Sequence, residues 1–126
     1  MPRRILIVDD EPHIRLLLEQ TLEDWAEATG VELLSASNGL DALALIQSQR
    51  PNLVFLDVMM PQMNGFDVCR QVKQELALEG IYIVLLTAKG QEFDKAQGRA
   101  VGADQYMTKP FDPDQVVRCA MEVLGC

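Results

Sequence analysis

Short apolar segments alternate with amphipathic segments along the whole of this chain, at a nearly constant period. The candidate strands are residues 5–8, 31–36, 53–56, 81–86 and 105–108. Three of them, 5–8, 53–56 and 81–86, are continuously apolar, which is typical of strands buried on both faces of a parallel sheet. The other two, VELLSAS and DQYMTK, are more polar, and this predicts that they form the edges of the sheet.

The segments between the strands have helical spacing. Pro12 suits the first turn of a first helix, and Asn38 and Asn64 are suited to cap a second and a third. A weaker fourth helix is expected over residues 91–101, ending near Gly102, and Asp112 with Pro113 begins a fifth. The residues expected on the inner face of the first helix are Ile14, Leu17, Leu18, Leu22 and Trp25. Those expected on the inner face of the third are Phe66, Cys69, Val72 and Leu76.

Strands that alternate with helices predict an α/β fold, in which helices cover both faces of a parallel sheet. With the second and fifth strands at the edges, the order 2-1-3-4-5 follows, which is a doubly wound, flavodoxin-like (βα)5 arrangement. The 126 residues are expected to form one domain. Winding reverses between the first and third strands, and ligands of such sheets bind at the carboxyl ends of the strands at that point.

Charge and composition exclude several classes of function. The net charge of -8 disfavours direct binding to nucleic acid or to anionic membranes. No long apolar span and no signal peptide is evident in the sequence. The three cysteines form no CxxC pair and are expected to be free thiols in a reducing cytoplasm.

Polar residues follow the predicted strands at their carboxyl ends. Asp9 and Asp10 follow the first strand, Asp57 the third, Thr87 the fourth and Lys109 the fifth. Three converging carboxylates raise one another's pKa unless a cation lies among them, and Lys109 supplies only one positive charge. Oxygen ligands favour Mg²⁺, with Mn²⁺ as an alternative, so the sequence predicts a divalent cation site.

The same residue types suit phosphoryl transfer. The carboxylate of Asp57 can attack phosphorus and form an acyl phosphate, while the cation and Lys109 stabilise charge on the phosphoryl oxygens. The Thr87 hydroxyl can donate a hydrogen bond to one of those oxygens. Asp57, Lys109 and Thr87 are therefore the candidate catalytic residues.

Four motifs, ILIVDDEP, LVFLDVMMPQMNG, VLLTA and ADQYMTKPF, occur in order with suitable spacing. In these motifs the chain resembles the receiver domain of bacterial two-component response regulators, of the chemotaxis-regulator type. The resemblance implies that Asp57 accepts a phosphoryl group from a histidine kinase or phosphotransfer protein. It also implies that Asp10, Asp57 and the backbone carbonyl of Met59 bind Mg²⁺, and that Asp9 contributes through water.

Further roles are implied by the same resemblance. Thr87 and Tyr106 are expected to form a conformational switch, and Lys109 to contact the phosphoryl oxygens. The bond between Lys109 and Pro110 is expected to be cis. A target protein or a second copy of the chain is expected to dock on the face formed by the fourth helix, fifth strand and fifth helix.

Two other functions compete with that of a phosphorylation-dependent switch. A metal-dependent aspartyl-phosphate phosphatase places a second acid two residues after its nucleophile, and here that residue is Met59. A receiver fold that binds its partner without phosphorylation usually lacks one of the acids or the lysine, and all of them are present here.

The sequence ends soon after the fifth helix, so we expect either a stand-alone regulator or a piece of a longer regulator or hybrid kinase. A signalling domain that catalyses its own phosphorylation and dephosphorylation is favoured over an enzyme that acts on other substrates.

Overall fold

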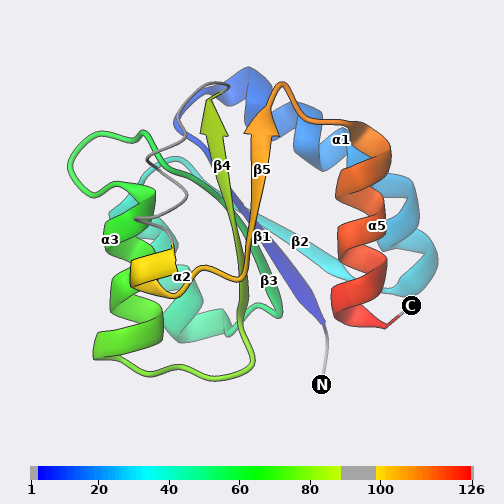
Figure 1. Cartoon of the computed structure of the whole chain (residues 1–126). Helices are drawn as coiled ribbons and strands as arrows, with labels where there is room; N and C mark the ends of the chain where they lie inside the picture. Colours follow the sequence, from blue (N-terminus) through cyan, green and yellow to red (C-terminus); the bar gives the residue numbers. More distant parts are fainter. Residues whose placement is uncertain (1–2, 89–98, 126) are drawn as a thin grey trace.

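A parallel sheet of five strands forms the centre of the molecule (Figure 1). The computed structural model describes residues 3–88 and 99–125. The strands are β1 (Arg4–Val8), β2 (Glu32–Ala36), β3 (Leu53–Asp57), β4 (Tyr82–Ala88) and β5 (Gln105–Lys109). Their order is β2-β1-β3-β4-β5, and every neighbouring pair is parallel. The predicted doubly wound order, with the two more polar strands at the edges, is confirmed.

Helices connect the strands, and three of these helices begin at the capping residues that the sequence predicted. The helices are α1 (Pro12–Thr29), α2 (Gly39–Gln49), α3 (Gly65–Arg70) with a π-helical extension η1 (Gln71–Glu75), and α5 (Pro113–Leu124). The side chains of Asn38, Asn64 and Asp112 cap α2, α3 and α5. Of the predicted fourth helix, residues 91–98 lie outside the described residues, while 99–101 are helical and Gly102 follows at φ 91°.

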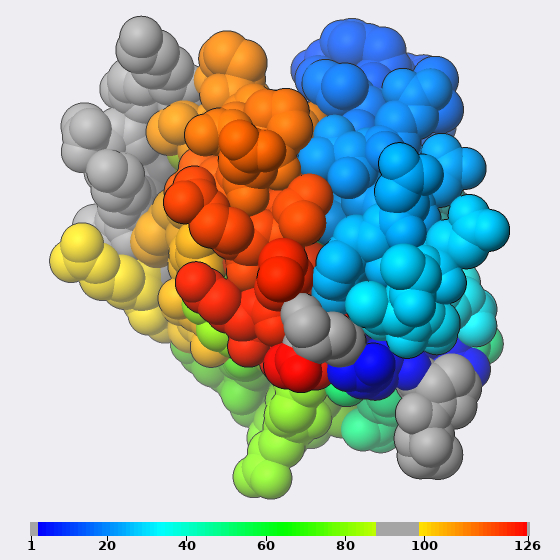
Figure 2. Space-filling model, turned by 90° about the vertical axis from the view of Figure 1, so that its right-hand side faces the viewer, coloured from blue at the N-terminus to red at the C-terminus, as the bar shows by residue number. Residues whose placement is uncertain are grey.

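The sheet separates two apolar cores. α1 and α5 cover one face and lie side by side (Figures 1 and 2), whereas α2 and α3 cover the other (Figure 1). Phe55 and Leu86 point toward α1 and α5, and their strand neighbours Leu56 and Leu85 point toward α2 and α3. The central strands β1, β3 and β4 are buried on both faces. This packing fixes the positions of their carboxyl ends.

Two residues expected on inner helix faces are instead exposed. Leu17 is 46% exposed, because the face of α1 that meets the sheet is centred on Leu18 and Leu22. Leu76 is 40% exposed, because its N–H donates to the carbonyl of Gln71 across a wider π-helical turn that rotates it off the inner face. The apolar stripe of α3 therefore ends at Val72.

The π-helical turn is tied to the end of the sheet opposite the polar strand ends. Lys73 Nζ lies 2.8 Å from the Asp104 carboxylate and donates to the carbonyl of Ile81 at 2.6 Å. The same Asp104 carboxylate accepts the N–H of Ile83 at 2.8 Å. This network fixes the starts of β4 and β5 against η1.

None of the helices in the described part of the chain combines the length and hydropathy needed to span a bilayer.

Candidate functional site

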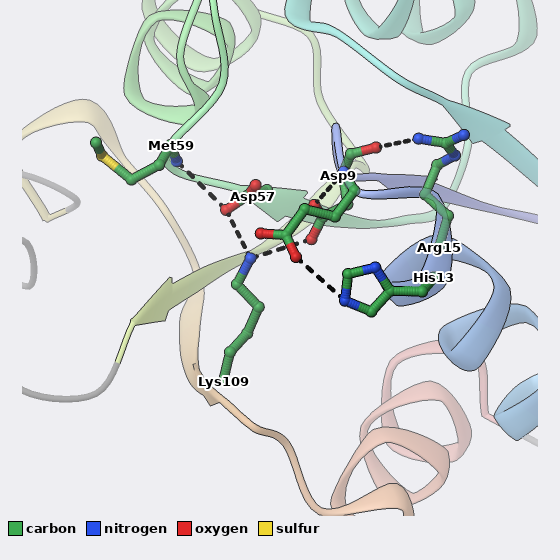
Figure 3. Close-up of polar contacts among 7 residues, drawn as sticks. Asp9, His13, Arg15, Asp57, Met59 and Lys109 are labelled. Atoms are coloured by element: carbon green, nitrogen blue, oxygen red, sulfur yellow. Dashed lines mark hydrogen bonds and ion pairs between the residues drawn. The ribbon is translucent and has the colours of Figure 1, made fainter.

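Three carboxylates and one ammonium group meet at the carboxyl ends of the strands (Figure 3). Asp57 is the last residue of β3 and Lys109 the last of β5, while Asp9 directly follows β1. The register pairs Val8 with Leu56, so the next residues along, Asp9 and Asp57, lie side by side. The sequence prediction that these residues converge is confirmed as geometry.

Lys109 joins the two buried acids. Its Nζ lies 3.2 Å from Asp9 Oδ2 and 3.2 Å from Asp57 Oδ1. The Asp9 side chain is 0% exposed and that of Asp57 is 3% exposed, so both depend on protein partners rather than on water. The N–H of Met59 also donates to Asp57 Oδ1, at 3.3 Å, while the Met59 side chain projects into solvent.

Burial governs the electrostatics of Asp57. Loss of solvent, reinforced by repulsion from Asp9, raises the pKa of Asp57 from 3.8 to about 7, against an opposing attraction from Lys109. Burial lowers the pKa of Lys109, but the attraction of Asp57 and Asp9 outweighs it, so the net shift is upward. Lys109 is therefore positively charged, and Asp57 remains partly protonated near pH 7 unless further positive charge lies nearby.

The three acids lie close enough together to hold a metal ion. One carboxylate oxygen each from Asp9, Asp10 and Asp57 lies within 4.8 Å of the others, and Asp10 is exposed at the mouth of the group. Three carboxylates against one lysine leave a charge of about -2 by simple counting, which the charge of such an ion would balance. The ligands are all oxygen atoms, as Mg²⁺ and Mn²⁺ prefer.

The first turn of α1 supplies contacts that were not predicted. Arg15 Nη1 donates to the backbone carbonyl of Asp9 at 2.6 Å, and the N–H of Glu11 donates to Asp9 Oδ1 at 3.0 Å. At the edge of the site, His13 Nε2 lies 3.3 Å from a carboxylate oxygen of Glu11 (Figure 3). In sequence, the only signal for Arg15 is its place on the first turn of a helix that directly follows the acids.

Thr87 and Tyr106, the predicted switch residues, lie on the other face of the sheet from Asp57. Asp57 pairs with Leu86, so the next side chain along β4, that of Thr87, points to the opposite face. Leu85 pairs with Tyr106, and both pack on the side of α2 and α3. Thr87 is buried and Tyr106 is partly buried. Both lie on the face covered by α2 and α3, whereas Asp57 lies on the face covered by α1 and α5. The peptide bond between Lys109 and Pro110 is cis, as expected.

Gly65 sets how closely α3 approaches Asp57. A methyl group on Gly65 would clash with the Asp57 carbonyl oxygen and would lie 3.0 Å from Val58 Cα, both of them backbone atoms that cannot turn aside. Gly65→Ala is therefore expected to lower the free energy of unfolding by about 1–3 kcal/mol. It should also shift the amide resonances of Asp57 and Val58 in an NMR spectrum.

Gly30→Ala is the control for this substitution, because nothing lies within 4 Å of the added methyl group. It adds only the strain of a left-handed backbone at φ 75°, about 1 kcal/mol, and should leave the Asp57 resonance in place. Equal losses of stability, with no local change at Asp57 in either variant, would contradict the close-approach argument.

Comparisons with known proteins agree with this geometry. A profile of the response regulator receiver domain matches residues 5–120. The alkaline phosphatase synthesis transcriptional regulatory protein PhoP of Bacillus subtilis is 44% identical over 92% of this chain, which spans 46% of that protein. Protein PilG of Pseudomonas aeruginosa is 37% identical over 90% of this chain and 82% of its own length. The chain thus spans about half the length of PhoP and most of PilG.

Solved structures give the same result. A putative response regulator from Chloroflexus aurantiacus superposes with a TM-score of 0.85 at 32% identity, covering 100% of both chains. The BeF3-activated DrrB receiver domain superposes with a TM-score of 0.84 at 27% identity, again over 100% of both. With the profile, the sheet order and the acid cluster in agreement, the chain belongs to the response regulator receiver domain family.

Proposed function

We propose that Asp57 accepts a phosphoryl group from the phosphohistidine of a histidine kinase or phosphotransfer protein, and that the modified domain changes conformation to signal. The observation that carries this proposal is the placing of Asp57: a buried carboxylate, 3.2 Å from Lys109, inside a group of three acids at the strand ends. Receiver domains are signalling domains. Asp9 is equally buried, but Glu11 N–H and Lys109 engage its two carboxylate oxygens separately, whereas Lys109 and Met59 N–H both reach the same oxygen of Asp57, Oδ1.

The chemical step would be a displacement at phosphorus. An Asp57 carboxylate oxygen forms the new O–P bond as the P–N bond to the donor histidine breaks, and the imidazole leaves with the electron pair and takes up a proton. Asp10, Asp57 and the Met59 carbonyl would hold Mg²⁺, with Mn²⁺ as an alternative, and Asp9 would contribute through water. A bound cation would neutralise charge on the phosphoryl oxygens. Hydrolysis of the acyl phosphate by water would reset the domain.

Lys109 already lies where a phosphoryl group on Asp57 Oδ1 would need a cation. After transfer, Asp57 exchanges one carboxylate charge for a group of about -1.5 to -2, which attracts Lys109 and the Thr87 hydroxyl. Movement of Thr87 toward Asp57 would empty space on its own face of the sheet, where Tyr106 lies two residue pairs along the register. We propose that this exchange is the switch, and that it shifts an existing equilibrium.

The proposed partners follow from the family and the charge. A kinase or phosphotransfer protein would supply the phosphoryl group, and a target protein or second copy would dock on the face of the fourth helix, β5 and α5. PhoP is by name a transcriptional regulator, and this chain spans about half of it. Residues 1–126 are proposed to be one receiver domain that does not itself bind nucleic acid, whether alone or within a longer regulator. The buried free thiols of Cys69 and Cys119 suit the proposed cytoplasmic location.

Incubation with Mg²⁺ and a small acyl phosphate tests the proposal directly. Intact mass should rise by one phosphoryl group, and borohydride reduction followed by peptide sequencing should map the modification to Asp57. The same incubation with a chelator should give no change in mass. A phosphoryl group on His13, the one histidine in the sequence, or none anywhere under conditions that preserve the fold, would refute the proposal.

A further inference from the structure

Each polar group of Asp9 has a partner in the protein. Its N–H donates to the Ala36 carbonyl at 3.3 Å, Oδ1 accepts the Glu11 N–H at 3.0 Å, and Oδ2 lies 3.2 Å from Lys109 Nζ. Its backbone carbonyl accepts Arg15 Nη1 at 2.6 Å, a short charge-assisted bond. Lys109 and Arg15 approach Asp9 from opposite sides (Figure 3).

The bond from Arg15 acts on the peptide group that leads into Asp10. The carbonyl oxygen of Asp9 belongs to the planar unit that joins these two residues, so fixing that oxygen fixes the plane from which Asp10 departs. Asp10 lies beyond the end of β1 at Val8 and before the start of α1 at Pro12, outside the regular hydrogen bonding of either element. Its carboxylate is also the exposed member of the acid group.

We propose that Arg15 is a positioning residue for the cation site: by holding the Asp9 carbonyl, it sets the direction of the Asp10 carboxylate and so the affinity for the divalent ion. This inference rests on the proposed function, since it takes Asp10 to be a ligand. Partners that orient metal ligands from behind typically change metal affinity by 10–100-fold when removed.

The charge of Arg15 makes the direction of the effect informative. A guanidinium beside a cation site repels the ion, so a purely electrostatic role predicts that removing Arg15 tightens binding. A positioning role predicts weaker binding, because the Asp10 carboxylate then samples directions away from the ion. The two roles have opposite signs in one measurement.

A neutral side chain of similar length can replace Arg15 without opening a buried void. Arg15 forms part of the wall of a surface hollow of about 430 Å³, whose polar lining includes Ser35, Ser37 and Asp41. Arg15→Met keeps the length of the apolar stem and removes the donor. Arg15→Lys keeps the charge and a group that can donate to the carbonyl. Arg118→Met, on the exposed surface of α5, removes the same charge at a distance and is the control.

Mn²⁺ alone is the probe, with the free ion followed by electron paramagnetic resonance and thermal unfolding recorded without metal. We expect binding about 10-fold weaker in Arg15→Met, recovery of most of that loss in Arg15→Lys, and a change under twofold in Arg118→Met. Should Arg15→Met not fold, Arg15→Leu, which also lacks a donor, takes its place with the same expectation.

Unchanged or tighter Mn²⁺ binding in a folded Arg15→Met protein would overturn the inference. So would equal losses in Arg15→Met and Arg15→Lys, because the lysine retains a donor that a positioning role would use. Failure of the wild-type protein to bind Mn²⁺ would instead count against the cation site of the proposed function. The two failures are therefore distinguishable.

Discussion

Asp57→Asn is expected to carry no phosphoryl group and, in the absence of metal, to be more stable than the wild type by about 2–3 kcal/mol at pH 8. The first result follows because an amide nitrogen or oxygen in place of the carboxylate is a poor nucleophile toward phosphorus. The second follows because burial and Asp9 raise the pKa of Asp57 from 3.8 to about 7. Asparagine fills the same space without a charge.

The sign of the pH dependence follows from proton binding. Between about pH 4 and pH 7 the folded protein holds a proton on Asp57 that the unfolded chain has released, so the stability of the wild type falls as pH rises through this range. The decline is complete above pH 7. Asp57→Asn should lack this contribution, and the two proteins should therefore differ more at pH 8 than at pH 5. A full shift of three pKa units would correspond to about 4 kcal/mol, and loss of the attraction to Lys109 reduces the gain.

Urea unfolding with a chelator present, followed by the fluorescence of Trp25 at pH 5 and pH 8, measures this difference. Trp25 packs against the core between the sheet and α1 and reports on global unfolding. Asp24→Asn, at an exposed position of α1, is the control and should track the wild type at both pH values. Parallel pH profiles for wild type and Asp57→Asn would mean that the buried carboxyl is not destabilised by its surroundings.

Lys109→Met is expected to have an effect of similar size in the opposite direction. Removing this lysine takes away the cation that lies 3.2 Å from both Asp9 and Asp57, and leaves two buried acids facing each other. Breaking a buried ion pair in this way typically costs about 3–5 kcal/mol. Loss of Lys109 also removes the attraction that lowers the pKa of Asp57, so protonation of Asp57 should relieve part of that loss as the pH falls. The variant should therefore be least stable at high pH, and its transfer of phosphoryl groups should be slowed for want of a cation on the phosphoryl oxygens.

A double-mutant cycle measures the coupling behind this effect. Asp57→Asn added to Lys109→Met should restore a substantial part of the lost stability at pH 8, because one of the two stranded charges is then gone. Lys109→Arg, which keeps the charge, should be close to the wild type in stability. Additive effects of Asp57→Asn and Lys109→Met would show that the two groups do not interact in the folded protein.

The parts of this structure that follow from periodicity were predictable from the sequence. Continuous apolar segments indicated the central strands, and parallel strands necessarily bring their carboxyl ends to one edge, so the meeting of Asp9, Asp57 and Lys109 could be inferred without coordinates. Leu76 could not be placed, because a single π-helical turn changes the phase of a helix and leaves no mark in residue type. Leu17 differed because an apolar stripe does not reveal where its centre lies.

The contact from Arg15 was not predictable for a different reason. A first-turn arginine is ordinarily a solvated side chain, and whether it folds back to a particular carbonyl depends on its rotamer and on the exact corner between β1 and α1. The functional role of a residue does not follow from its position alone. Thr87 and Tyr106 lie on one face, and Asp57 on the other, as strand alternation requires, but a switch between them is a property of two states and has to be measured.

Alternation along β5 also has an evolutionary consequence. Met107 and Lys109 face the side of α1, α5 and the acids, while Tyr106 shares the opposite side with Leu85, so neighbouring residues of one edge strand belong to different environments. Under the proposed roles, substitutions on the Tyr106 side of β5 would change the target protein that binds, while the rate of phosphoryl transfer stayed the same. Along this five-residue strand, duplicated regulators could therefore diverge in target specificity and keep the residues of phosphoryl transfer.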